Sequence, residues 1–143
     1  MGFRYFTKEY ALGLIEKMLE QTGNSLVIIK PENLDGPFEF VKNDLYYPTI
    51  EDKVAYLMYS FNTNHCFIDG NKRASVVLAC FFLELNGYDF IVDSFLRRIE
   101  NFAIYVADGK VDKEFLTEII RSLIYEDDFS EELKIEIVNT IFN

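Results

Sequence analysis

The chain has 143 residues, half of them apolar, which is enough to bury a hydrophobic core without disulfides, and we expect one domain over residues 1–143. Its 14 basic and 24 acidic residues give a formal net charge of -10, which opposes general binding to nucleic acids. The two cysteines, Cys66 and Cys80, are too few for a disulfide framework, and no apolar run reaches the roughly 18 residues of a membrane span. We therefore expect a cytoplasmic protein that binds neither nucleic acid nor a membrane.

Two amphipathic helices are predicted in the first half of the chain. Thr7 is a typical helix cap, apolar residues follow it at helical spacing, and Gly23 ends the pattern. Thr49 starts the second helix with Asp52 three residues later, the signature of a capping box, and this helix is expected to end near Asn62.

The stretch between these helices is irregular. Residues 25–30 and 38–41 are short β-branched or aromatic runs, and proline and glycine separate them. This pattern favours a loop and allows a small β-hairpin.

The second half of the chain predicts four helices. Between Asn71 and Leu85 apolar residues occupy every side of the helix, a pattern typical of the middle of a bundle, and Gly87 ends it. Three further helices begin near Asp93, Asp112 and Ser130. The expected fold class is all-α, a helical bundle around a buried central helix.

A polar loop over residues 62–70 leads into this central helix. The backbone N–H groups of Gly70, Asn71 and Lys72 are expected to be unpaired donors at the helix start, with the positive end of the helix dipole behind them. Gly70 allows a close backbone approach, and Lys72 and Arg73 add two cations. The sequence therefore predicts a phosphate site here.

The same loop carries a candidate base and a candidate metal ligand. His65, the only histidine of the chain, has a side chain suited to taking a proton from an attacking hydroxyl. Asp69 offers a hard oxygen ligand for Mg²⁺. At least one of Phe67 and Ile68 should turn inward and hold the loop on the core. Together these groups describe transfer of a phosphorus-containing group from a nucleotide to a hydroxyl.

The loop resembles the motif of the Fic/Doc family, His-x-Phe-x-Asp/Asn-Ala/Gly-Asn-Lys/Gly-Arg, which is matched here by His65, Phe67, Asp69, Gly70, Asn71, Lys72 and Arg73. The similarity extends from about Leu45 to Tyr88. It implies a Fic/Doc-like helical domain that uses ATP and Mg²⁺ and modifies a hydroxyl side chain of a target protein.

The resemblance also implies a role for each matched residue. His65 would be the general base, Asp69 would hold Mg²⁺, and Phe67 would anchor the loop. The nucleotide phosphates would be held by Gly70, Asn71, Lys72 and Arg73. Residues 38–42 occupy the place of the family's flap, which pairs with the backbone of the target.

Lys72 favours one branch of the family. Members that transfer AMP usually carry glycine at this position, whereas the short Doc (death-on-curing) toxins carry lysine and resemble kinases. The resemblance therefore implies a growth-inhibiting kinase that phosphorylates a Ser/Thr hydroxyl, by analogy of a translation factor. It also implies a separate antitoxin, because the family's inhibitory Ser/Thr-x-x-x-Glu-Gly/Asn motif is not found. AMP transfer and a catalytically inactive interaction module remain the alternatives.

Cys66 departs from the motif, since many relatives have proline there. Two interpretations of Cys66 are open. Its thiol, next to the base, could be oxidised, or the residue could serve only as a small buried side chain. A zinc site is excluded because one histidine and two cysteines cannot supply four protein ligands.

Overall fold

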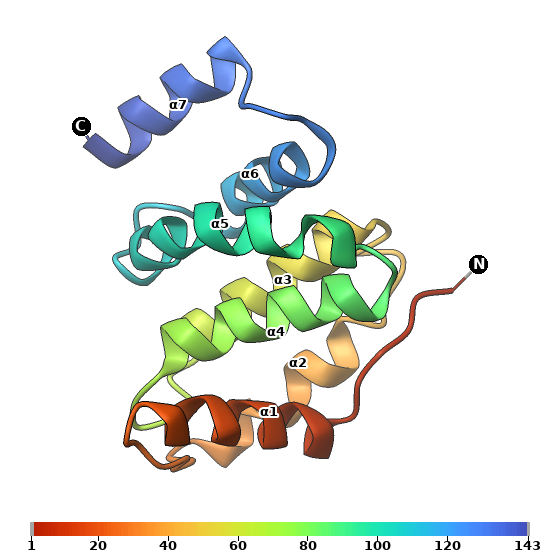
Figure 1. The fold of residues 1–143 in the computed structure, drawn as a ribbon, viewed down its shortest axis with the longest axis vertical. Coiled ribbons are helices and arrows are strands. Elements are labelled where there is room, and N and C mark those ends of the chain that lie inside the picture. The colour runs from red at the N-terminus through yellow and green to blue at the C-terminus, as the bar shows by residue number, and fades with distance from the viewer. Residues whose placement is uncertain (1, 143) are drawn as a thin grey trace.

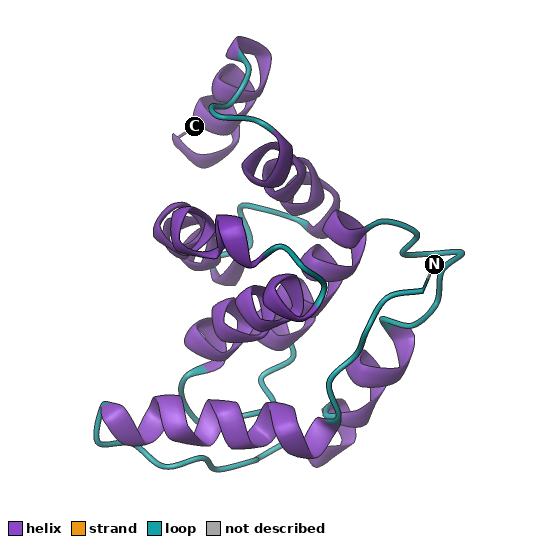
Figure 2. Ribbon diagram, turned by 45° about the vertical axis from the view of Figure 1, so that its right-hand side comes forward, coloured by secondary structure: helices purple, strands orange, loops and turns teal. Residues whose placement is uncertain are grey.

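A computed structural model describes residues 2–142, and within that range all regular secondary structure is helical. Figures 1 and 2 show helices joined by loops. The α-helices are α1 (Lys8–Gln21), α2 (Asp35–Phe40), α3 (Ile50–Thr63), α4 (Asn71–Leu85), α5 (Val92–Ala107), α6 (Lys113–Tyr125) and α7 (Glu131–Phe142), with short 3₁₀ turns at η1 (Pro31–Asn33) and η2 (Asp89–Ile91).

Helix α4 lies in the middle of the bundle, as the sequence predicts. Figure 1 shows it between α1 on one side and α5 on the other, with α3 alongside. Five of its residues are completely buried, namely Ala74, Ser75, Leu78, Ala79 and Leu83. The start of α4 is therefore held by neighbours on several sides.

The helix starts that the sequence predicts are confirmed by their caps. Thr7 accepts a hydrogen bond from the backbone N–H of Tyr10 at 3.1 Å. Thr49 and Asp52 form the expected capping box, in which each side chain accepts from the other residue's backbone N–H at 3.2 Å. These side chains satisfy N–H groups that the first helical turn leaves unpaired.

The small β-hairpin does not form in the described residues, and this prediction is wrong. Residues 38–40 belong to α2, where Leu34, Pro37, Phe38 and Val41 are buried and Phe40 is 61% exposed. The buried positions follow the spacing i, i+3, i+4, i+7 of a helix. Pro37 does not prevent it, because first-turn N–H groups have no partner within the helix in any case.

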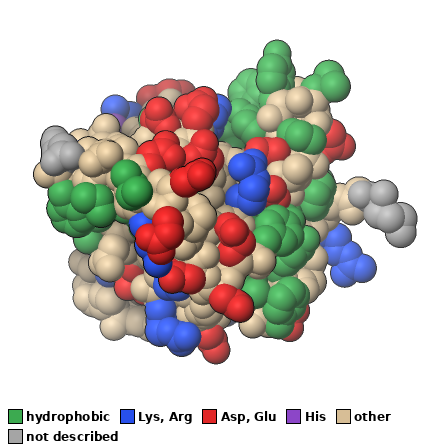
Figure 3. Space-filling model, turned by 90° about the horizontal axis from the view of Figure 1, so that it is seen from above, with side chains coloured by type: hydrophobic (Ala, Val, Ile, Leu, Met, Phe, Trp, Pro, Cys, Tyr) green, Lys and Arg blue, Asp and Glu red, His purple; other side chains and the backbone are tan. Residues whose placement is uncertain are grey.

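Helix α7 lies at the edge of the molecule, furthest from α4 in Figure 1. Ile141 is its one buried residue among those described. Figure 3, which views this end from above, shows acidic and apolar side chains next to each other on the surface. None of the helices in residues 2–142 combines the length and the hydropathy that crossing a membrane requires.

Candidate active site

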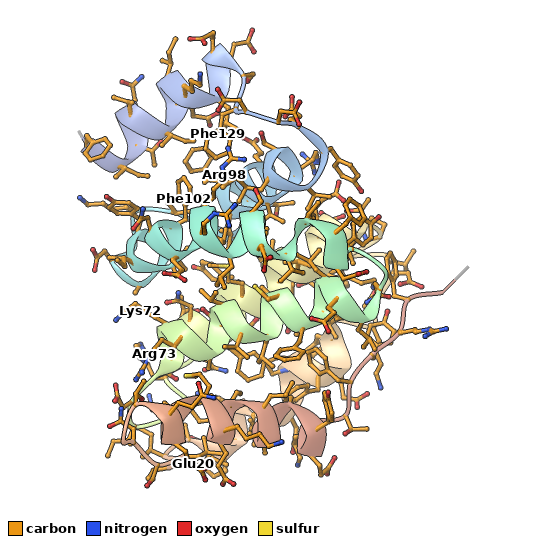
Figure 4. The ribbon with its side chains drawn as sticks, viewed as in Figure 1. Glu20, Lys72, Arg73, Arg98, Phe102 and Phe129 are labelled. Carbon is orange, nitrogen blue, oxygen red and sulfur yellow. The ribbon has the colours of Figure 1, made fainter. Side chains whose placement is uncertain are left out.

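The predicted site residues meet in one cleft of about 230 Å³ at the end of α3 and the start of α4. Figure 4 shows Lys72 and Arg73 at this end of α4, with Arg73 in the space between α4 and α1. The lining comes from the loop, from the start of α4 and from the end of α5, and consists of Asn62, His65, Ile68, Asp69, Gly70, Asn71, Lys72, Arg73 and Ala107.

His65 occupies an unusual backbone position. It follows Asn64, the C-cap of α3, and has a φ of 54°, the only positive φ at a non-glycine residue in the described chain. The left-handed conformation after a helix C-cap is common, but glycine usually supplies it. A residue with a side chain costs roughly 1 kcal/mol more there. The turn leaves the imidazole exposed at the cleft.

Phe67 and Asn71 close the loop on itself. The Phe67 backbone N–H donates to Asn71 Oδ1 at 3.1 Å, and Asn71 Nδ2 donates to the Phe67 carbonyl at 2.9 Å. The Phe67 ring is 1% exposed and stacks on Phe61 with 6.5 Å between ring centroids. Phe67 thus lies where an anchor is expected. The side chain of Asn71 is therefore occupied inside the loop, although the residue lines the cleft.

Position 70 requires glycine for two reasons, the left-handed backbone conformation and the close approach of Leu19. Its φ is 82°, and a Cβ built on it would lie 2.7 Å from Leu19 Cδ2 of α1. No side chain in residues 2–142 caps α4. The backbone N–H groups of the first turn are therefore open to solvent or to an anion, with the positive end of the helix dipole behind them.

The charged side chains of the cleft are partly paired. Arg73 Nη1 donates to Thr22 Oγ1 at 3.0 Å, and Arg73 Nη2 lies 3.7 Å from Asp69 Oδ2. Both members of this ion pair are solvent-exposed, so its stabilising effect is small. Lys72 is exposed and has no ion pair with the residues that the structure describes.

An extended segment, residues 27–30, lies along the loop, and sequence reasoning gave it no such role. Ile29 and Lys30 donate from their backbone N–H groups to the Cys66 carbonyl at 2.9 and 3.2 Å, and Ile68 donates to the Val27 carbonyl at 3.0 Å. The β-branched run in this segment was the available signal. The stretch at 38–42, where the sequence placed the flap, is largely helical, and the backbone pairing beside the loop comes from residues 27–30.

The sequence profile of the Fic/DOC family matches residues 5–83, which span the loop and the helices on both sides of it. The chain belongs to the Fic/DOC family. Members of this family are typically enzymes that transfer nucleotide or phosphate groups.

A curated relative, Toxin Doc of Mycolicibacterium smegmatis (strain ATCC 700084 / mc(2)155), is 38% identical over 66 residues. The aligned part covers 46% of this chain and 51% of the relative. The chain therefore spans about half the length of the curated relative it matches.

The metal donors of this Fic/DOC cleft are few. Asp69 is the one carboxylate among its lining residues, and residues 2–142 contain no group of three or more His, Cys, Asp or Glu side chains that could enclose a metal. Mg²⁺ is commonly bound by one or two carboxylates, with waters and substrate phosphates as its other ligands. The donor set thus fits a magnesium ion that arrives with a nucleotide.

Cys66 is a buried core residue and not an exposed thiol. It is completely buried, and its Sγ lies 3.5 Å from the carbonyl oxygen of Lys30. Burial raises the pKa of the thiol, which suppresses the reactive thiolate. Of the two sequence interpretations, the small buried side chain is confirmed.

A cavity larger than the cleft lies elsewhere among the described residues. It has a volume of about 650 Å³, lies between α2, α3 and the start of α6, and shares no lining residue with the cleft. It lacks the histidine and the open helix start, so its size alone does not make it the reaction site.

Proposed function

We propose that the chain is a Doc-like toxin kinase that transfers the terminal phosphate of ATP to a Ser/Thr hydroxyl of a target protein. The observation that supports this most directly is the gathering of His65, Asp69, Lys72 and Arg73 around the uncapped start of α4. A base, one carboxylate and an anion site in one cleft are what a phosphoryl transfer to a hydroxyl requires.

In this proposal each group of the cleft has one task. Lys72, Arg73 and the N–H groups at Gly70 and Asn71 bind the nucleotide phosphates, and Asp69 contributes the protein ligand to Mg²⁺. Bound Mg²⁺ neutralises charge that develops on the phosphate oxygens. His65 takes the proton of the target hydroxyl as its oxygen bonds to the terminal phosphorus and ADP leaves.

Lys72 is the basis for choosing phosphate transfer over AMP transfer. Its ammonium group is exposed at the cleft and has no ion pair with a described residue, so it is available to a phosphate. A cation at this place also narrows one phosphate subsite, which favours a shifted nucleotide. AMP transfer is the nearest alternative chemistry, and a catalytically inactive interaction module is the alternative of a different class.

The proposed target is a cytoplasmic protein, by analogy a translation factor, and a separate antitoxin restrains the toxin. The relative named Toxin Doc supports the toxin and antitoxin part of this proposal. The segment 27–30 is proposed to align the target beside the cleft. Its residues Val27, Ile28 and Ile29 are 43%, 37% and 49% exposed, and the neighbouring Ile68 is 63% exposed.

Incubation with γ-labelled or α-labelled ATP, Mg²⁺ and a bacterial cell extract tests the chemistry. Label from the γ position on a protein supports the kinase, and label from the α position supports AMP transfer. Removing Mg²⁺ with a chelator or changing His65→Ala should abolish either signal. If neither label is transferred, and His65→Ala behaves like wild type, the result favours the interaction module.

A second pair of variants tests the role of Lys72. Lys72→Ala should lower γ-label transfer by about 10- to 100-fold, because a charge-assisted hydrogen bond contributes about 1.5–3 kcal/mol. Lys17→Ala, at an exposed position of α1 outside the cleft, is the matched control and should transfer label like wild type. Equal loss in both variants would count against a specific role for Lys72.

A further inference from the structure

Asn62 has a buried oxygen without a partner in the wall of the cleft. The residue is 3% exposed and lines the cleft together with His65. Its Nδ2 donates to the Ala103 carbonyl of α5 at 2.9 Å, whereas its Oδ1 has no hydrogen-bond partner among residues 2–142. Buried polar atoms are rarely left unpaired, so this acceptor calls for a donor.

The orientation of the Asn62 amide is determined by its neighbour. A carbonyl oxygen can only accept, so the amide nitrogen must face Ala103, and a flipped amide would place two acceptors against each other. Oδ1 therefore points away from α5. It is shielded from solvent, which favours a donor from the protein over bulk water.

The imidazole of His65 can supply the donor that Asn62 Oδ1 lacks. Its imidazole has no hydrogen-bond partner among the described residues and is exposed, so it can change rotamer freely. A neutral imidazole that accepts a proton at one nitrogen carries N–H at the other, and that N–H needs an acceptor to fix the tautomer. Asn62 lies in the last turn of α3 and His65 follows the C-cap of that helix, and both residues line the same cleft.

The two other asparagine side chains of the loop already have hydrogen-bond partners. Asn71 Oδ1 accepts from the Phe67 N–H, and Asn64 Oδ1 accepts from the Cys66 N–H at 3.1 Å. Asp69 also lines the cleft, but it is exposed, lies 3.7 Å from Arg73 through Oδ2 and is the proposed metal ligand. Among the described lining residues, Asn62 Oδ1 is the acceptor that is both buried and without a partner.

We propose that Asn62 is a positioning residue whose Oδ1 accepts the imidazole N–H of His65 and fixes the tautomer that acts as base. The catalytic part of this inference depends on the proposed function, whereas the hydrogen bond itself does not.

Because the chain has a single histidine, ¹⁵N NMR of the imidazole tests the hydrogen bond without assignment of other signals. In wild type with a neutral imidazole, one tautomer should dominate, with a slowly exchanging N–H and a nuclear Overhauser contact to Asn62. In Asn62→Leu both tautomers should be populated and the N–H should exchange with solvent.

Asn62→Asp is the matched variant. Both variants lose the amide N–H that donates to the Ala103 carbonyl. Asn62→Asp keeps a side-chain oxygen that can accept the imidazole N–H, whereas Asn62→Leu has no acceptor. Asn62→Asp should retain the single tautomer. In a transfer assay, Asn62→Leu should lower kcat by about 10- to 100-fold with little change in the KM for ATP, since a positioned general base contributes about 10²- to 10⁴-fold.

A mixed tautomer in wild type, or an unchanged tautomer in folded Asn62→Leu, would overturn the inference. If Asn62→Leu does not fold, the nuclear Overhauser contact in wild type is the test. Its presence supports the hydrogen bond between Asn62 and the imidazole, and its absence overturns it. If no transfer activity exists at all, the proposed function fails while the NMR result still stands.

Discussion

At the scale of single residues, the most informative position is His65. Its left-handed backbone costs free energy that a glycine would save, yet the chain has a histidine at this turn. Strained residues of this kind concentrate at functional sites, because the surrounding structure can hold a side chain in a direction that relaxed backbone would not provide.

The substitution His65→Gly should therefore separate stability from activity. It should raise the free energy of unfolding by about 1 kcal/mol relative to His65→Ala, which keeps the left-handed backbone but lacks the imidazole. Both variants should lose label transfer. Urea unfolding measures the first effect, and a glycine variant no more stable than the alanine variant would show that the backbone is not strained.

Gly70→Ala tests the close approach of the loop to α1. We expect a loss of about 2–4 kcal/mol in unfolding free energy, from the left-handed φ and from the contact with Leu19. Gly109 is the matched control, since its φ is 78° and no atom lies within 4 Å of the place that a Cβ would take. Gly109→Ala should cost about 1 kcal/mol, and equal losses at the two sites would rule out the Leu19 contact.

Cys80 provides a test by pH. Burial raises the pKa of its thiol to about 12, so the folded state keeps a proton that the unfolded state loses near pH 9. Stability from this group is complete below about pH 9 and decreases as the pH rises towards 12. Between pH 8 and 10.5 wild type should lose about 2 kcal/mol more than Cys80→Ala in urea unfolding. Parallel pH curves for the two proteins would contradict this.

At the scale of helices and loops, the sequence predicted what local chemistry determines. Thr7, Thr49 and Asp112 cap helices as expected, because a cap needs only residues that are close in sequence. The helix start at Asn71 and the gathering of the motif residues follow for the same reason. Whether these residues perform the assigned chemistry stays a prediction.

Three features were not predicted from the sequence. Helix α2 was missed because the aromatic residues at 38 and 40 alternate like a strand, and the buried set that makes it a helix spans a Gly-Pro pair. The pairing of residues 27–30 with the loop joins segments almost forty residues apart. The open oxygen of Asn62 likewise depends on α5, which contributes the Ala103 carbonyl.

The capping box of α3 can be tested against a threonine inside a helix. Thr49→Ala should lower the unfolding free energy by about 1 kcal/mol, because the backbone N–H of Asp52 loses its acceptor and the Asp52 carboxylate loses the Thr49 hydroxyl. Thr117→Ala in α6 is the control, where alanine is the better helix former and a small change is expected. Equal urea midpoints for Thr49→Ala and wild type would show that the box contributes nothing.

At the scale of the whole molecule, the helices differ in how firmly they are held. Helix α4 is buried on several sides, whereas α7 buries Ile141 and is further tied by Lys110 Nζ, which donates to the Ile141 carbonyl at 3.1 Å. Helix α1 is also peripheral, but it buries Ala11, Ile15 and Leu19. Few buried contacts mean that local opening requires little free energy.

Hydrogen exchange followed by mass spectrometry should therefore rank these helices. Peptides from α7 should exchange first, at a free energy well below that of global unfolding, α1 should follow, and α4 should exchange last. Helix α1 is the control, because it is peripheral like α7 but has more buried residues. A difference between α1 and α7 therefore reflects burial and not the position at the edge. Protection of α7 equal to that of α4 would mean that the bundle opens as a single cooperative unit.

The pairing of Arg73 with Asp69 has a consequence for ligand affinity. Under the proposed roles, Mg²⁺ draws Asp69 away from Arg73, and phosphate draws Arg73 away from Asp69. Mg²⁺ alone would leave the Arg73 charge without a partner, and phosphate alone would leave the Asp69 charge without one. When both ligands are bound, each of the two charges has a partner. Each ligand should then raise the affinity for the other by the same factor, because such coupling is reciprocal. The loop would respond to the metal–nucleotide complex more strongly than to its separate parts.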